Sequence, residues 1–590
     1  MSKTAIDQGS NMDRIEQLEA ALDINWAQAN NIRIDPVRRL TGPGLIWDHP
    51  GAVVDVFFED IDAGTLTSLW EKHARHVLDA LGWTDERLAH RRFQGGVNLA
   101  ISAPMDQLYT AIFAALTAWH YCAAELLNAA HMPFAQMIND LKTVMAQEAN
   151  PDLIALIAAA AAHDVDILCD DDEVSLGHGI GSRTWPIAGL PKPDQVPWPT
   201  LHDVPFALIT GTNGKTTTTR LCAAIARAAG KVTGMTSTDH VQVDDDVLDR
   251  GDYSGPGGAR MVLRDPRVQI ACLEVARGGI LRRGLACRRA RVAVVTNVAK
   301  DHLGEYGVNT LTELAQAKFA VARGLASDGV LVLNADDPHV VEGAANISAP
   351  IWWFSLDAAA PQILQAKKLG QPCAYLDQGQ MVFFDGSTTA LTLAVADVPI
   401  TLAGAAKYNI HNALAAICAS SALGLPRDAI RLGLSSFVSD ARNNPGRFNE
   451  FHHNGARIFV DFAHNPHSIS AVCDAMALFP SKRRFMMLSQ PGDRSDQSTA
   501  EATIAALQFK PDLIVIAEID DYLRGRALDE TPALIQASAT SAGIKPEHIA
   551  HVSSPSIGAK QIFDQLQPGD LALLLVLSDR ERVFEILANA

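Results

Sequence analysis

A glycine-rich turn holds the residues that are best suited to chemistry. The apolar run Phe206–Thr210 precedes Gly211-Thr-Asn-Gly214, and Lys215 and Thr216 follow directly. Glycines let backbone N–H groups approach a polyphosphate, and the N-terminus of a following helix adds its positive end. A lysine here can reach the β- and γ-phosphates, and a threonine hydroxyl can ligate Mg²⁺. The pattern predicts a phosphate-binding loop with shortened glycine spacing; a plain strand-to-helix turn is the alternative, which the Lys-Thr pair disfavours.

The elements that must position this loop are predicted to alternate between strands and helices. The runs Ile270–Leu273, Val292–Val295 and Val330–Leu333 are short and rich in β-branched residues, as strands buried on both faces of a parallel sheet are. Polar residues follow each run, and ligands of open α/β sheets bind beyond the carboxyl ends of the strands. Glu274 is therefore predicted to complete the Mg²⁺ shell that begins with Thr216. A solvated carboxylate at a strand end is the alternative.

The chain of 590 residues is too long for one hydrophobic core, so we expect three domains of overall α/β class. An α+β domain is expected at 1–163, and an acidic and proline-rich linker at 164–204. A central domain with a mostly parallel sheet is expected at 205–443, and a smaller C-terminal α/β domain at 444–590. In this arrangement the C-terminal domain can cover a nucleotide held by the central domain.

Composition excludes several classes of function. The net charge of −18 disfavours a nucleic-acid partner, because such proteins carry a basic face. The eight cysteines form no C-x-x-C pair, so neither a zinc site nor a disulfide framework is expected, and a reducing cytoplasm fits. The N-terminus lacks the pattern of a signal peptide. The uncharged stretch Gln107–Ala124 is interrupted by polar residues, so no membrane span is predicted.

Motifs from about Pro205 to the C-terminus resemble the Mur ligase family, which includes folylpolyglutamate synthase. The resemblance is strongest to the Mur-ligase-like half of cyanophycin synthetases. It is carried by residues 211–217, 251–256, 259–266, 273–280, 301–304, 334–338, 408–412, 445–448, 461–466, 491–494 and 523–526. The last two segments, together with the Arg-Gly-Gly that follows Val275-Ala276, point to the cyanophycin branch.

The resemblance implies a central P-loop domain and a Rossmann-like C-terminal domain that closes over ATP. It also implies amide-bond formation with ATP and Mg²⁺, in which a carboxylate attacks the γ-phosphate and an amine then displaces phosphate from the acyl phosphate. Lysine and Mg²⁺ offset the repulsion between the two anions. The implied partners are amino acids or short peptides, and a homo-oligomer is left open.

Individual residues receive roles from the same resemblance. Catalysis is assigned to Lys215, Glu274, His302 and Lys318, and metal binding to Thr216, Glu274 and His302. Nucleotide binding is assigned to Gly211, Thr212, Asn213, Gly214, Lys215, Thr216, Thr217, Asn409, Asn412, Arg447 and Asp461. Substrate binding is assigned to Arg260, Arg277, Asp493, Arg494 and Arg526, with structural salt bridges as the alternative for the last three. Lys318 falls near the position at which several relatives carry a carbamylated lysine. An ordinary lysine on the helix surface is the alternative.

The chain departs from cyanophycin synthetases ahead of the central domain. Residues 174–187 resemble only the opening of an ATP-grasp domain, and the segment 38–43 gives the N-terminal domain only a faint likeness. A single ligation is therefore expected rather than stand-alone polymer synthesis. A nucleotide-binding partner or regulator without catalysis is the alternative, which the intact Lys215, Thr216, Glu274 and His302 disfavour. A P-loop kinase or transport ATPase is disfavoured by the motifs that follow residue 444.

Overall fold

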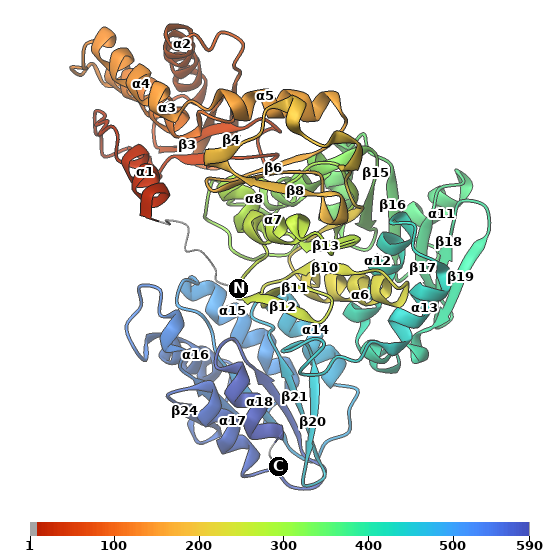
Figure 1. Cartoon of the computed structure of the whole chain (residues 1–590). Coiled ribbons are helices and arrows are strands. Elements are labelled where there is room, and N and C mark those ends of the chain that lie inside the picture. Colours follow the sequence, from red (N-terminus) through yellow and green to blue (C-terminus); the bar gives the residue numbers. More distant parts are fainter. Residues whose placement is uncertain (1–8, 589–590) are drawn as a thin grey trace.

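The computed structural model describes residues 9–588 and arranges them in three bodies (Figure 1). The N-terminal body lies at one end, a large central sheet lies in the middle, and the C-terminal domain lies at the other end. Among these residues no helix has the length and apolar character that crossing a membrane requires.

The N-terminal body is an antiparallel sheet covered by helices. Its elements are α1 (Gly9–Glu19), β1 (Ile32–Ile34), β2 (Arg38–Leu40), β3 (Gly51–Phe58), α2 (Ala63–Leu81), β4 (Leu88–Phe93), β5 (Gly96–Ser102), α3 (Leu108–Leu127), α4 (Phe134–Glu148) and α5 (Pro151–Ala162). The strand order is β1-β3-β5-β4, and β2 also pairs with β3. Val54 and Val56 share a core with Trp70 of α2 and Trp119 of α3, because alternate residues of β3 face the helices.

Residues 164–204, for which a linker is expected, contain ordered secondary structure. The strands β6 (Ile167–Cys169), β7 (Glu173–Leu176) and β8 (Arg183–Pro186) form a small antiparallel sheet. Leu176 and Val196 pack against Leu156 of α5, so an apolar core fixes the segment to the N-terminal body. The turn-forming residues that suggest a linker therefore lie between three short strands.

The central sheet has eleven strands in the order β12-β11-β10-β13-β9-β14-β15-β16-β17-β18-β19. They are β9 (Phe206–Thr210), β10 (Thr233–Thr236), β11 (His240–Val243), β12 (Asp246–Arg250), β13 (Ile270–Glu274), β14 (Ala290–Val295), β15 (Leu325–Asn334), β16 (Ile351–Ser355), β17 (Cys373–Asp377), β18 (Gln380–Phe384) and β19 (Thr389–Ala394). In this order, the strands from β10 to β17 pair in parallel. The strands beyond them at both edges pair antiparallel. The chain leaves β9 towards β10 and β13 and later returns to its other side as β14, which makes the loop after β9 a topological switch point.

Helices cover both faces of the central sheet. They are α6 (Lys215–Ala228), α7 (Pro256–Arg264), α8 (Arg277–Arg283), α9 (Leu311–Phe319), α10 (Pro338–Gly343), α11 (Pro361–Lys368), α12 (Lys407–Ala422) and α13 (Arg427–Ser436). Ile209 of β9 packs with Leu221 of α6 and Leu414 of α12. Leu208 faces the opposite core, with Val262 of α7. Burial on both faces explains the continuous apolar runs of these strands.

The C-terminal domain is a second, smaller α/β unit with the strand order β20-β21-β25-β22-β23-β24. Its elements are β20 (Asn449–His453), β21 (Ala456–Asp461), α14 (Pro466–Met476), β22 (Arg484–Leu488), α15 (Asp496–Ala506), β23 (Leu513–Ala517), α16 (Glu530–Ser541), β24 (Ile549–Val552), α17 (Pro555–Phe563), β25 (Leu571–Leu575) and α18 (Arg580–Ala588). Every pairing except that of β20 with β21 is parallel. The predicted α/β class, with two mostly parallel sheets behind an α+β region, is confirmed.

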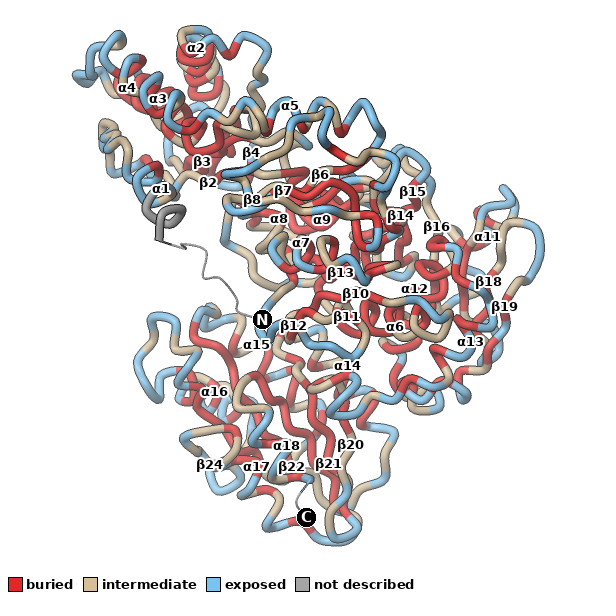
Figure 2. The backbone as a smooth tube through the Cα atoms, viewed as in Figure 1, coloured by how far each residue is buried: buried red, intermediate tan, exposed pale blue. Residues whose placement is uncertain are grey.

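The carboxyl ends of the two parallel sheets face each other. The burial pattern in Figure 2 shows the strands of both sheets as cores that helices enclose. Between these cores, the side-chain amide of Asn465, in the loop after β21, donates to Asn213 in the loop after β9 at 2.9 Å. Asp239, after β10, pairs with Arg580 at the start of α18 at 2.8 Å. The junction between the central and C-terminal domains is therefore polar and lies where ligands of such sheets bind.

Candidate active site

The loop after β9 needs glycine at two positions. Gly211 and Gly214 have φ angles of 150° and 85°. A Cβ atom on Gly211 would lie 1.8 Å from the Thr296 hydroxyl, and one on Gly214 would lie 2.2 Å from the side-chain oxygen of Asn412. No larger residue fits there without moving its neighbours. The Lys215 ammonium donates to a carbonyl oxygen of the loop at 3.0 Å, so its side chain curls over the turn.

A cavity of about 560 Å³ opens above the loop, between the central and C-terminal domains. The central domain lines it with Lys215, Thr216 and Glu274, and the C-terminal domain adds Arg447 and Asp461. Most of the residues predicted to bind nucleotide line it: Thr212, Asn213, Gly214, Lys215, Thr216, Thr217, Asn409, Asn412, Arg447 and Asp461. Residues far apart in sequence thus meet in one space of the size that small ligands occupy.

Two asparagines of α12 support the loop from the side. The amide of Asn412 donates to the side-chain oxygen of Asn409 at 3.0 Å, and Asn409 donates to the Ile400 carbonyl oxygen at 2.9 Å. This chain of hydrogen bonds fixes the Asn412 oxygen against Gly214. Contact of either asparagine with the nucleotide stays a prediction.

Asp461 ends β21 inside the cleft. Its carboxylate accepts a hydrogen bond from the Ala463 backbone N–H at 2.7 Å. Burial raises the pKa of Asp461 to about 6, although the charge of Arg447 acts in the opposite direction. The carboxylate is therefore charged at neutral pH, and its charge is lost in mildly acidic solution.

Glu274 presents a carboxylate that suits a divalent cation. The side chain is buried, and its Oε2 accepts a long hydrogen bond from the Thr238 N–H at 3.3 Å. Its Oε1 has no hydrogen-bond partner among residues 9–588. Burial raises the pKa of Glu274, and the charge of Lys215 opposes this effect. An unpaired buried oxygen is costly, so oxygen donors from Glu274 and Thr216 fit a hard cation such as Mg²⁺.

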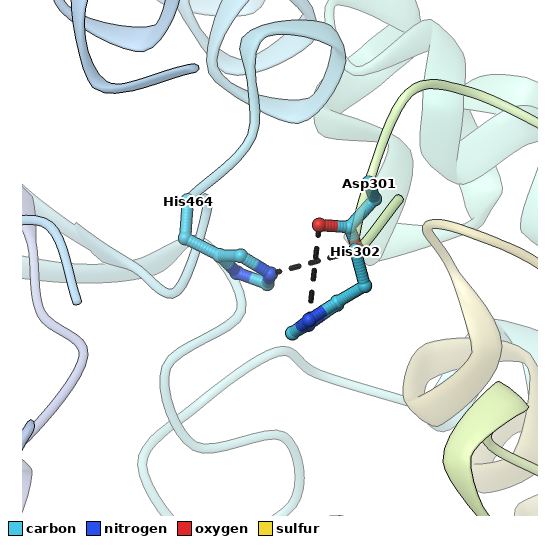
Figure 3. A group of neighbouring side chains, drawn as sticks. All are labelled: Asp301, His302 and His464. Carbon is cyan, nitrogen blue, oxygen red and sulfur yellow. Dashed lines mark ion pairs between the residues drawn. The ribbon is translucent and has the colours of Figure 1, made fainter. Parts of the chain in front are cut away.

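A second polar cluster joins the two domains beside Lys215. Figure 3 shows Asp301 and His302, which follow β14, with His464 of the C-terminal domain directed towards them. One ligand atom of each residue lies within 4.8 Å of the others. Arg494 already contacts two of these groups, at 2.8 Å from Asp301 Oδ1 and 3.2 Å from His302 Nε2.

Charges within this cluster determine its protonation. Burial alone would raise the pKa of Asp301, but His464, His302 and Arg494 together hold it well below its usual range. Burial lowers the pKa of His302 to about 4 and also lowers that of His464. Two neutral imidazoles and one carboxylate can accept hydrogen bonds or ligate a metal at neutral pH. His302 as a metal ligand stays a prediction, since Arg494 occupies the same side of the ring.

Lys318 is not a helix-surface lysine. It lies on α9 with 3% of its surface exposed. Burial, together with the charge of Lys215, lowers the pKa of Lys318 well below its usual value. The surface alternative is therefore wrong, because this side of α9 faces the protein interior. The buried amine of Lys318 lies close enough to Asp301 and Lys215 for their charges to act on it.

Comparison with known proteins shows which family combines these features. Residues 209–420 match the Mur ligase middle domain, and residues 446–575 match the glutamate ligase domain of Mur ligases. These two segments belong to the Mur ligase family. The family resemblance found in the sequence is thereby confirmed, and both walls of the cleft come from Mur ligase domains.

The Mur ligase domains of this chain are similar in sequence or in fold to several ligases. The chain is 39% identical to cyanophycin synthetase of Synechocystis sp. over 371 residues, which are 62% of this chain and 42% of that protein. It is 28% identical to UDP-N-acetylmuramate–L-alanine ligase of Xylella fastidiosa over 393 residues, 65% of this chain and 73% of the other. The solved structure of E. coli FolC with DHPP and ADP has 20% identity and a TM-score of 0.48, covering 65% of this chain and 89% of FolC. The chain spans about two fifths of the length of the cyanophycin synthetases it matches.

The predicted substrate residues of the Mur ligase domains lie in different places. Arg277 donates to the His302 carbonyl oxygen, and Arg494 reaches the same cluster. Arg526 donates to the Arg494 carbonyl oxygen at 2.8 Å. Asp493 pairs with a neighbouring arginine.

Arg260 lies apart from these residues. It lines a separate cavity, where its guanidinium lies 3.3 Å from Asp170. The structure therefore brings Arg277, Arg494 and Arg526 together near the cleft and leaves Arg260 outside it.

Sequence reasoning missed a charge cluster at the domain junction. Asp239 accepts hydrogen bonds from Arg220 at 2.7 Å and from Arg580 at 2.8 Å. Arg220 is almost wholly buried on α6, the helix that starts at the phosphate-binding loop. The signal in sequence was an arginine placed between four threonines and the apolar run that follows, since a buried arginine needs a carboxylate.

Proposed function

We propose that this chain is an ATP- and Mg²⁺-dependent ligase that joins an amino acid to a carboxylate of another amino acid or a short peptide, releasing ADP and phosphate. The observation that carries the proposal is the cleft itself. A phosphate-binding loop with Lys215, a cation-ready Glu274 and the paired groups Arg447 and Asp461 from the second domain all line it. The Asp301 cluster adjoins it and again draws on both domains.

The reaction consists of two displacements. A carboxylate oxygen attacks the γ-phosphorus of ATP, the bond to the β,γ-bridging oxygen breaks, and ADP leaves. The amine nitrogen then attacks the carbonyl carbon of the acyl phosphate, phosphate leaves from the tetrahedral intermediate, and the nitrogen loses a proton. Lys215 and the loop N–H groups offset the charge of the triphosphate and of the attacking carboxylate. Arg494, held by Asp301 beside the same loop, adds a positive group from the opposite wall.

Thr216 and Glu274 are the residues that would hold Mg²⁺, and His302 is the candidate for a second ion. The bound cation neutralises phosphate charge and makes the γ-phosphorus more open to attack. The chain itself keeps Glu274 in place through Thr238 and keeps water out by burying the carboxylate.

The substrate class is proposed from the relatives. The UDP-N-acetylmuramate–L-alanine ligase is named for a ligation that involves the amino acid L-alanine. We propose one addition per turnover rather than polymer synthesis, and a cytoplasmic location. The acidic net charge of −18 suits small-molecule partners rather than nucleic acid.

Phosphate release from ATP, measured across a panel of paired amino acids with mass spectrometry of the products, tests the proposal. At least one pair is expected to stimulate release and to yield a condensed product. Lys215→Ala is expected to lower that rate at least about a hundredfold, as loss of a charge contact to the transferring phosphoryl group does. Lys231→Ala, an exposed lysine beyond the other end of α6, serves as the matched control. Tight ATP binding without product in any mixture would instead identify a non-catalytic nucleotide-binding protein.

A further inference from the structure

A second cavity, of about 260 Å³, lies where the N-terminal body, the segment 164–204 and the central domain meet. None of its lining residues lines the cleft above the phosphate-binding loop. Most of them precede residue 209, where the match to the Mur ligase family begins. The cavity is therefore separate from the cleft in which the ligase reaction is proposed.

Arginines and aspartates converge on this cavity. Arg39, only 7% exposed, pairs with both carboxylate oxygens of Asp171 at 2.9 and 3.1 Å. Its guanidinium also stacks over the Tyr109 ring at 3.9 Å. Arg260 shares the other aspartate, Asp170, with a second arginine of α7. A wall of preorganised guanidinium groups thus lines one side.

The cavity lining holds as many acidic as basic side chains, and its arginines differ in how far they are already paired. The carboxylate of Asp170 forms ion pairs with both Arg260, at 3.3 Å, and Arg264, at 2.6 Å. The Nε atom of Arg260 is the atom that lies 3.3 Å from Asp170, and this contact does not meet hydrogen-bond geometry. Burial lowers the pKa of Arg260, and the charge of Asp170 opposes this effect. Arg283, at the exposed rim, forms no ion pair with any side chain among residues 14–588.

Apolar side chains complete the other side of the cavity. Ile15, Leu18, Leu153 and Ile187 face the same space as the arginines. Such a lining suits a molecule with a charged end and a hydrocarbon portion. The volume lies below the range of roughly 300–1,000 Å³ that is usual for drug-sized ligands, which indicates a small metabolite.

We propose that this cavity binds a small organic anion, with a carboxylate or phosphate group held between Arg260 and Arg283. Guanidinium groups bind both kinds of oxyanion through paired N–H donors. The proposal does not rest on the ligase reaction. It does place a ligand one helix away from it, because α8 ends at Arg283 and begins at Arg277, which contacts the His302 carbonyl oxygen.

Calorimetric titration with succinate, L-glutamate and inorganic phosphate tests the proposal and distinguishes the two oxyanions. Titrations are run with ADP and Mg²⁺ in excess and repeated in Lys215→Ala, so that binding at the phosphate-binding loop does not contribute. At least one of the three anions is expected to bind to one site per chain under both conditions. Failure of all three to bind would overturn the proposal.

Two neighbouring arginines of α8 provide the matched variants. Arg283→Ala is expected to weaken binding about ten- to hundredfold, the effect of losing a hydrogen bond to a charged group. Arg260→Gln is expected to weaken it similarly. Arg282→Ala removes the same charge from an exposed side chain outside the cavity and is expected to leave affinity within about twofold. Equal weakening by Arg282→Ala and Arg283→Ala, or unchanged affinity in Arg283→Ala, would refute a site in this cavity.

Discussion

Replacing Asp239 with asparagine tests whether a buried charge cluster joins the central and C-terminal domains. Asp239 accepts hydrogen bonds from Arg220, in the central core, and from Arg580, at the start of α18. Burial alone would raise its pKa. The charges of Arg447, Arg220 and Arg580 outweigh burial and lower the pKa from 3.8 to about 2. The charged form of Asp239 is therefore more stable, relative to the neutral form, in the folded protein than in the unfolded chain.

The size of this effect follows from the shift. A fall in pKa from 3.8 to about 2 is worth about 2 kcal/mol of folding free energy, at ~1.36 kcal/mol per unit. Because the folded pKa is the lower one, this stabilisation is present above about pH 4 and is lost as the pH falls through about 2. Asp239→Asn is expected to cost at least about 2 kcal/mol, and up to about 5 kcal/mol because Arg220 remains buried without a carboxylate.

Urea unfolding followed by circular dichroism at pH 8, 7 and 6 measures the loss. The same difference from wild type is expected at all three values, since Asp239 stays charged in both the folded and the unfolded chain. Asp246→Asn is the control, because Asp246 lies at the opposite end of the β11–β12 hairpin and forms an exposed pair with Arg267. An exposed pair contributes less than about 1 kcal/mol. A loss of under about 1 kcal/mol for Asp239→Asn, or one that shrinks between pH 8 and 6, would refute the reasoning.

Three further predictions concern the cleft. Because Asp461 has a pKa of about 6, affinity for a non-hydrolysable ATP analogue is expected to rise several-fold between pH 5 and 7 in calorimetric titrations. This rise is expected to be absent in Asp461→Asn, and a flat wild-type profile would contradict it. Arg494→Met is expected to slow product formation at least about tenfold, whereas Lys300→Met, which removes an exposed ion pair between the same domains, is expected to stay within about twofold. Lys318→Met replaces a buried amine by an apolar side chain. Its free energy of unfolding, measured by thermal unfolding, is expected to differ from wild type by under about 1.5 kcal/mol. Its turnover is expected to fall at least about a hundredfold, and retained turnover would remove Lys318 from the chemistry.

Local pattern was sufficient to predict the glycine turn between β9 and α6 and the strands around it. Gly211, Gly214 and Lys215 act through backbone shape and short reach, which neighbouring residues determine. The runs 270–273, 292–295 and 330–333 lie in β13, β14 and β15, because a strand buried on both faces needs apolar residues throughout. The two mostly parallel sheets follow from the same pattern.

Contacts between distant segments could not be predicted in the same way. The burial of Lys318 depends on how α9 packs against the loop after β14, and its own helix gives no sign of it. The cluster of Asp239, Arg220 and Arg580 joins residues that are more than 300 positions apart at its extremes. Residues 164–204 have the composition of a linker, yet a few apolar side chains are enough to dock three strands on α5.

The hydrogen bond between Asn213 and Asn465 joins the two domains whose residues line the cleft. If the C-terminal domain swings away, the glycine turn and Lys215 stay with the central sheet, while Arg447 and Asp461 depart. ATP held by the open form would meet only half of the groups that neutralise a departing phosphate, and bulk water would enter beside it. Under the proposed ligase reaction, separation of the two walls would then suppress idle hydrolysis, and ATP would be cleaved only when the walls come together.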